Sequence, residues 1–247
     1  MNGPERIPLA QLALMLLPLG LVGVLYIKLV GDAKLVAYAT TRMVVQLILI
    51  GFVLAHIFAV SHWAVSLLVG AFMLAVAASI AVRPVGREHY LNLLIALACG
   101  TVPVLGLVLV GVLQTSPWYE PSFFIPLAGM VCANTMNALS LSADRFLSER
   151  RTVSLAQARK RAFETALLPN INSFFAVGLV SLPGMMTGQI LAGADPIQAV
   201  KYQIVVMFMI AAATSLGCII IVLLIYRRMF TARHQLDSAI IRRRRQA

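Results

Sequence analysis

The chain has 247 residues, of which 60% are hydrophobic and only 12% are charged, and its net charge is +11. Soluble domains carry about 25% charged residues, so this composition excludes an ordinary soluble protein. The apolar residues come in runs of about 20, the length that crosses a hydrocarbon core of ~30 Å. The positive charge therefore indicates basic residues at the ends of membrane spans rather than a nucleic-acid-binding surface. We expect an all-α, polytopic protein of the lipid membrane that binds no nucleic acid.

Seven apolar segments are long enough to predict about seven transmembrane helices. The sixth contains Pro183 and Gly184, which either break the helix, make it re-entrant or only kink it. The seventh begins with Asp195, Pro196 and Gln198, which is typical of a helix start with an N-terminal cap at the aspartate. The predicted spans cover about residues 7–30, 36–60, 63–82, 90–113, 123–143, 169–192 and 196–226.

The basic residues are distributed unevenly between the two sides of these spans. With the N-terminus outside, eighteen of the twenty Lys and Arg residues fall on one side. Because cytoplasmic loops carry an excess of Lys and Arg, this bias places the C-terminus, with its basic tail at 228–247, in the cytoplasm. The same rule places the segment 145–168, between spans five and six, in the cytoplasm. We expect the whole chain, 1–247, to form a single transmembrane domain.

The cytoplasmic segment 145–168 is basic and has small and apolar residues at helical spacing. This pattern favours a short amphipathic helix along the membrane surface over a loop that only sets the topology. Such a helix could dock a cytoplasmic partner, and Pro169 follows where the chain re-enters the membrane. The residues that we expect to form the docking surface are Leu155, Ala158, Arg159, Arg161, Ala162, Leu168 and Pro169.

Spans five to seven carry polar, thioether and helix-breaking residues that could line a translocation path. Transporters place binding sites at broken spans, although interhelical hydrogen bonds and packing are alternative roles for such residues. None of the nine acidic residues lies in mid-span, and the four histidines share no ligand spacing, so the sequence identifies no metal ligands. The candidates for the path are Met130, Asn134, Asn137, Ser181, Pro183, Gly184, Met185, Met186 and Gln203.

The sequence contains no phosphate-binding motif of the form Gly-x-x-x-x-Gly-Lys-Ser/Thr. Such a loop is what cradles the phosphates of ATP in P-loop ATPases. We therefore expect no cofactor bound by this chain, and any coupling to ATP must come from another subunit.

Four blocks of the sequence stand out as motifs. They are Ile-Pro-Leu-Ala-Gly-Met at 125–130, Ala-Leu-Leu-Pro at 166–169, Val-Gly-Leu-Val-Ser-Leu-Pro-Gly-Met-Met-Thr-Gly at 177–188, and Ala-Gly-Ala-Asp-Pro at 192–196 with Lys-Tyr-Gln at 201–203. These blocks closely resemble the FetB family, whose members are the membrane permease subunits of a bacterial ABC transporter assigned to iron export. Plant relatives of that family are linked to aluminium tolerance. The resemblance covers nearly the whole chain, and its Leu-Pro-Gly-Met-Met block is specific.

The resemblance implies a permease of the cell inner membrane that exports iron and is not itself an enzyme. It also implies a homodimer that works with two copies of a separate ATP-binding subunit, which hydrolyses the ATP. The segment before residues 166–169 resembles a loose version of the ABC-permease coupling motif, without its acidic start and central glycine.

Three other functions stay open from the sequence. One is an ABC permease for another cargo, such as another metal or a nucleotide-sugar, because iron prefers carboxylate and histidine ligands that are not clustered here. Another is a secondary carrier independent of ATP, against which the absence of an intramembrane acid argues. The third is a membrane scaffold that recruits a cytoplasmic protein and transports nothing.

Overall fold

The computed structural model describes residues 8–30, 33–58 and 62–246, and these residues form helices without a β-strand. The expected all-α class is therefore confirmed. Contacts divide the chain into two units, residues 1–59 and 60–247, and each is described by itself. The start of the predicted first span, residue 7, and the side chains of the predicted basic tail, 228–247, lie outside the described residues.

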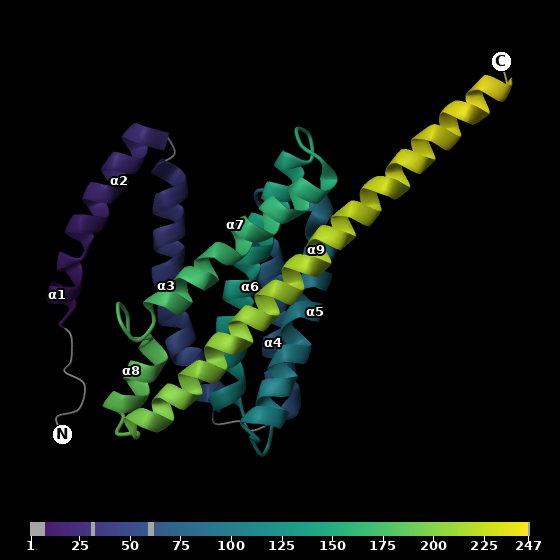
Figure 1. Ribbon diagram of the computed structural model, residues 1–247. Helices are drawn as coiled ribbons and strands as arrows, with labels where there is room; N and C mark the ends of the chain where they lie inside the picture. The colour runs from purple at the N-terminus through teal and green to yellow at the C-terminus, as the bar shows by residue number, and fades with distance from the viewer. Residues whose placement is uncertain (1–7, 31–32, 59–61, 247) are drawn as a thin grey trace. The chain divides into compact units, whose positions relative to one another are not determined.

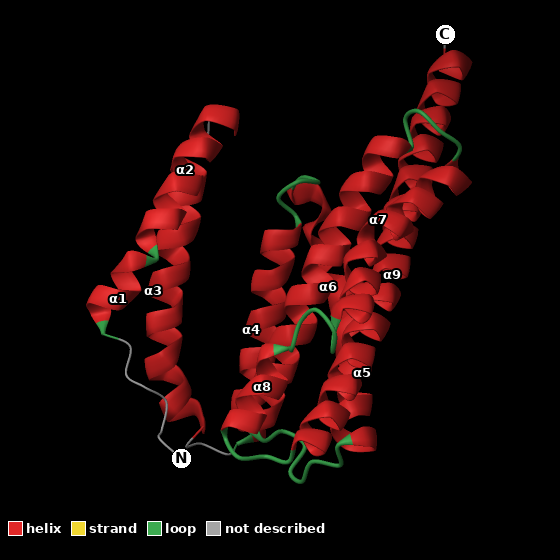
Figure 2. Cartoon of the chain, turned by 60° about the vertical axis from the view of Figure 1, so that its left-hand side comes forward, coloured by secondary structure: helices red, strands yellow, loops and turns green. Residues whose placement is uncertain are grey.

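The first unit contains α1 (Leu9–Leu14), α2 (Leu16–Val30) and α3 (Ala33–Phe58), and α2 packs beside α3 (Figures 1 and 2). In α3, the apolar stretch Val36–Phe58 is long enough to cross a membrane. The predicted first span is instead divided into α1 and α2. Pro18 has no amide proton for the carbonyl of Leu14, which accounts for the interruption between the two helices.

The second unit is a bundle of helices (Figure 2). Four stretches in it are long and apolar enough to cross a membrane, so the described residues contain five such stretches instead of the expected seven. The helices are α4 (Trp63–Ala81), the 3-10 turn η1 (Arg87–His89), α5 (Tyr90–Gly106) with its π-helical continuation η2 (Leu107–Val112), α6 (Pro121–Glu149), α7 (Leu155–Ala176), α8 (Gly184–Leu191) and α9 (Pro196–Gln246).

Helices α5, α6 and α9 approach one another closely at two glycines in the centre of this unit. A Cβ atom added at Gly100 of α5 would lie 2.8 Å from the carbonyl oxygen of Ala213 in α9. A Cβ atom added at Gly217 of α9 would lie 2.7 Å from Cδ1 of Leu139 in α6. Small residues at such crossings let membrane helices pack backbone to backbone. The positions of α6 and α9, which frame the site below, depend on these contacts.

The predicted sixth span differs most from the structure. Helix α7 starts at Leu155 and continues through Pro169 to Ala176, so the short surface helix expected before Pro169 is instead the first half of α7. The helix then ends, Gly178 takes a φ of +87°, and the eight-residue α8 starts only after Pro183. The structure therefore selects a broken span over a kinked one.

Contacts on both sides of Pro169 explain why α7 continues through this proline. A proline inside a helix removes one backbone hydrogen bond. Before it, Ala158, Ala162 and Ala166 are buried in the bundle. After it, Nδ2 of Asn170 donates a hydrogen bond of 2.7 Å to Oγ1 of Thr214 in α9. Tertiary packing thus holds the helix where local propensity would end it.

Candidate functional site

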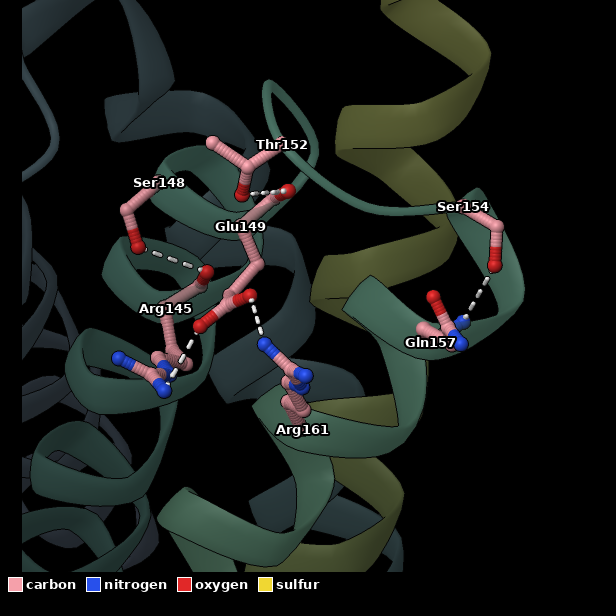
Figure 3. A network of polar contacts seen from close by, with 7 residues as sticks. All are labelled: Arg145, Ser148, Glu149, Thr152, Ser154, Gln157 and Arg161. Carbon is pink, nitrogen blue, oxygen red and sulfur yellow. Dashed lines mark hydrogen bonds and ion pairs between the residues drawn. The ribbon is translucent and has the colours of Figure 1, made fainter.

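The turn between α6 and α7 is closed by a carboxylate between two arginines (Figure 3). Oε1 of Glu149 lies 2.7 Å from Nη2 of Arg145, one turn earlier in α6, and its Oε2 lies 2.7 Å from Nη1 of Arg161 in α7. The Glu149 side chain is 10% exposed, whereas those of Arg145 and Arg161 are 46% and 48% exposed. This carboxylate therefore ties the first half of α7 to the end of α6.

Short polar contacts shape the rest of this turn. Oγ1 of Thr152 donates to the backbone oxygen of Glu149 at 3.2 Å, and Oγ of Ser154 accepts from the amide of Gln157 at 3.4 Å (Figure 3). Ser154 is thus the N-terminal cap of α7, in the manner typical of serine. The turn is short and capped, so α7 starts directly after the end of α6.

The predicted docking residues divide between two faces of α7. Ala158 and Ala162 are buried in the chain's own bundle, where their small side chains let α7 pack closely. Leu155, Arg159, Arg161, Leu168 and Pro169 are exposed, but Arg161 also pairs with Glu149 of α6, and Pro169 lines a cavity between α6, α7 and α9. The alanines are therefore packing residues, and only the exposed residues of α7 are accessible to a partner.

A cavity of about 220 Å³ lies between α6, α7 and α9. Its lining includes two residues with amide side chains, Asn134 and Asn170, together with Ser173 and Met207. Pro169 also lines this cavity, so the proline inside α7 and these polar residues lie together. The lining residues are Asn134, Pro169, Asn170, Ser173, Phe174, Met207 and Ile210.

Both amide nitrogens at this cavity already have partners within the chain. Nδ2 of Asn134 donates to the backbone oxygen of Met130 at 2.8 Å. Nδ2 of Asn170 donates a hydrogen bond to Oγ1 of Thr214 at 2.7 Å. The Thr214 hydroxyl in turn donates to the backbone oxygen of Ile210 at 2.8 Å. The amide orientations are therefore set by hydrogen bonds on the nitrogen side.

A larger cavity of about 480 Å³ lies between α4, α5 and α6, but its lining is apolar apart from a few groups such as Thr101 and Trp118. Polar or charged ligands need polar partners when they leave water. The smaller cavity is therefore the candidate site for a polar cargo. Among the described residues, no three His, Cys, Asp or Glu side chains form a group that could hold a metal ion.

Of the path candidates from the sequence, only Asn134 lines the polar cavity, and Met130 supplies the carbonyl that orients it. Asn137 is exposed on α6, whereas Gln203 is buried in α9, and its Oε1 has no hydrogen-bond partner among the described residues. The other candidates lie at the break in span six. Ser181 and Pro183 precede α8, and Gly184, Met185 and Met186 form its first turn.

Sequence reasoning did not single out Asn170, Ser173, Met207 and Thr214. A signal for two of them was present, because Asn170 and Ser173 lie one turn apart in an apolar run directly after Pro169. Residues three apart share one face of a helix. The partner Thr214 lies on a different span, and no local pattern indicates this contact.

The chain matches the Uncharacterised protein family (UPF0014) over residues 9–154 and 149–230. It is 38% identical to the UPF0014 membrane protein slr1647 of Synechocystis, over 81% of this chain and 84% of that protein. It is 36% identical to the probable iron export permease protein FetB of Escherichia coli, over 82% and 84% of the two chains. It is 33% identical to the protein ALUMINUM SENSITIVE 3 of Arabidopsis thaliana, over 82% and 80% of the two chains.

No solved structure gives a significant match to the chain. The family match spans most of the chain, and the E. coli relative carries the name of the family that the sequence resembles. Together with the five apolar helices, these matches confirm the expected relationship: the chain is a multi-pass membrane protein that belongs to the UPF0014 family, together with FetB.

Proposed function

We propose that this chain is the membrane permease subunit of an ABC transporter that exports a metal cation, most specifically iron, across the inner membrane. Its relative in Escherichia coli is named a probable iron export permease. The observation that carries the proposal is that α7 is one continuous helix, with an exposed basic first half and a second half that lines the polar cavity. Such a helix connects an outer docking surface to an inner site.

Helix α7 is suited to transmit a displacement from its exposed half to the cavity. At a rise of about 1.5 Å per residue, Arg161 and Asn170 lie about 13 Å apart along the axis of α7. Between them, Pro169 leaves the carbonyl of Thr165 without its helical hydrogen bond, which makes this point easier to bend. A displacement of the first half of α7 would therefore move Asn170 relative to Asn134.

The displacement would come from a separate ATP-binding subunit that docks on the exposed face of α7. Leu155, Arg159, Arg161 and Leu168 are exposed on α7, and Arg161 is also paired with Glu149. Their mixture of apolar and cationic side chains suits a protein partner with an acidic rim. In this proposal ATP is bound and hydrolysed by the partner, and this chain holds no cofactor. The docking surface and the C-terminal tail then lie on the cytoplasmic side.

A second copy of this chain would cover groups that lipid tolerates poorly. Asn137 of α6 and Asn172 of α7 are exposed within apolar sequence. At the break of span six, Leu179 is 91% exposed and Val180 is 83% exposed in irregular backbone. Irregular backbone at membrane depth faces protein or a cavity rather than lipid. These features support a homodimer in which 1–247 forms one permease domain.

The test is reconstitution of the chain with its ATP-binding subunit in lipid vesicles, followed by measurement of iron movement with and without ATP. We expect co-purification of the two subunits and iron movement that requires ATP. ATP-dependent movement of another metal or of a nucleotide-sugar, without iron, would refute the iron assignment. Flux driven by a proton gradient without any ATPase would refute the ABC class in favour of a secondary carrier, and the absence of any flux would favour a scaffold.

The docking claim has its own test. Arg159→Glu reverses a charge on the exposed face and should weaken co-purification of the ATP-binding subunit and stimulation of its ATPase. Arg83→Glu is the matched control, because Arg83 is also exposed but lies after α4, outside α7. Equal effects of the two reversals, or no effect of Arg159→Glu, would contradict docking on α7.

A further inference from the structure

We infer that the polar cavity between α6, α7 and α9 is a binding site for a partly hydrated divalent transition-metal cation. Its ligands are the side-chain oxygens of Asn134, Asn170 and Ser173. This inference rests on the proposed function for the class of cargo, and it adds the residues that hold the cargo and the state in which the cation is held.

The hydrogen bonds around the cavity use one N–H of each amide and leave both amide oxygens available to a ligand. The amide nitrogen of Asn134 donates to Met130, and the amide nitrogen of Asn170 donates to Thr214. The carbonyl oxygen of an amide points away from its nitrogen and is an acceptor with two lone pairs. Amide oxygens are ligands for hard and intermediate cations, so these two oxygens are suited to bind a cation.

Helix α9 orients one of these ligands, Asn170, through a hydrogen bond to Thr214. Oγ1 of Thr214 accepts from Asn170 and donates to the backbone oxygen of Ile210, so the hydroxyl is held on both sides. Outer groups of this kind position the ligands of metal sites and are part of their affinity. Thr214 is therefore a positioning residue that need not touch the cation.

The lining contains no carboxylate and no histidine. A neutral site cannot strip a divalent cation of all its water, because only a few oxygens replace the hydration shell. The cavity of about 220 Å³ is several times the ~30 Å³ that one water occupies in the liquid, so part of the shell can enter with the ion. Weak binding suits a transport site, since the ion must also leave.

The thioether of Met207 adds a different kind of donor to this lining. Sulfur ligands suit transition metals, whereas Mg²⁺ and Ca²⁺ are held by oxygen. The combination of neutral oxygens with one thioether therefore favours a first-row transition ion such as Fe²⁺ or Mn²⁺ over Mg²⁺.

The test uses Mn²⁺ as the probe, because its free form is measured directly by electron paramagnetic resonance. The purified full-length chain in lipid nanodiscs is titrated with Mn²⁺, with Mg²⁺ and Fe²⁺ as competitors, the latter without oxygen. We expect saturable binding that Fe²⁺ displaces and that a similar concentration of Mg²⁺ does not. Absence of saturable Mn²⁺ binding by the wild-type chain would overturn the inference.

Matched variants locate the site. Asn134→Asp keeps the size and adds a negative charge, so we expect binding at least about tenfold tighter, an increase that a misfolded protein would not show. Asn137→Asp places the same charge one turn further along α6, outside the cavity lining, so we expect it to tighten binding clearly less than Asn134→Asp does. Equal tightening by both variants would mean a general electrostatic effect and would overturn the site.

A second pair tests the ligand from α7. Asn170→Ala should weaken Mn²⁺ binding by at least about tenfold, whereas Asn172→Ala, two residues along the same helix and outside the cavity, should not change it. Unchanged binding by Asn170→Ala would overturn the site. If the wild type moves iron with ATP while none of these variants alters binding, the cavity assignment fails and the permease function stands. If these variants behave as expected but no ATP-dependent flux occurs, the permease function fails and the binding site stands.

Discussion

Replacement of Glu149 by glutamine should destabilise the junction between α6 and α7. Removing one partner of a buried ion pair costs about 3–5 kcal/mol. Here Arg145 and Arg161 are 46% and 48% exposed, so water can hydrate them again. We therefore expect roughly half of that cost, about 1.5–2.5 kcal/mol, for Glu149→Gln. The measurement is the free energy of unfolding of the purified chain in mild detergent, from a denaturant titration followed by circular dichroism.

Glu164→Gln is the control, since it makes the same change at a pair that is mostly exposed. Glu164 lies 3.7 Å from Lys160, and their side chains are 62% and 76% exposed. Exposed pairs of this kind contribute less than about 0.5 kcal/mol. A double-mutant cycle with Arg161→Gln should show coupling of about 1 kcal/mol or more to Glu149. Equal losses for the two glutamine variants, or no coupling in the cycle, would refute the reasoning.

Three further predictions concern helix packing, capping and ligand orientation. Gly100→Ala should lower the free energy of unfolding by about 1–3 kcal/mol, because the new Cβ atom would lie 2.8 Å from a backbone oxygen. Gly106→Ala is the control and should be tolerated, because the space around Gly106 is open. Equal stability of the two variants would contradict the close crossing. Asp195→Ala removes the acceptor for the amide of Gln198, 3.0 Å away, and should cost about 1 kcal/mol in the same titration; an unchanged stability would exclude this cap. Thr214→Val should weaken Mn²⁺ binding severalfold without loss of fold, measured by paramagnetic resonance and circular dichroism, and an unchanged affinity would exclude its positioning role.

The sequence predicted most of the membrane helices correctly, because length and hydropathy are local properties. Spans two to five and seven appear as apolar helices at nearly the expected positions. The start of α9 is also as expected, with Asp195 as its cap. The prediction of one continuous first span was wrong, because the missing amide proton of Pro18 separates α1 from α2. Hydropathy averaged over a span does not show such an interruption.

The candidate site was much less accessible to sequence reasoning. Asn134 was identified as a polar residue in a span, but its neighbours Asn170 and Ser173 were not, although they lie in the sixth span that proline and glycine made ambiguous. Glu149 and Arg161 are twelve residues apart, across a turn. Whether they meet depends on how α7 packs back on α6, and helical spacing within either segment does not indicate it.

By itself, the sequence determined the class of this protein, a multi-pass helical membrane protein that resembles the FetB family, because hydropathy and motifs are read residue by residue. Only the tertiary structure decided that the alanines of α7 face the bundle and that Arg161 pairs with Glu149 of α6. It also decided that α7 continues through Pro169 to a polar cavity, because Asn170 bonds to Thr214, which is 44 residues away in the chain. These outcomes depend on contacts between segments that are distant in sequence, and the energy of such contacts can exceed the local preference of a proline to end a helix.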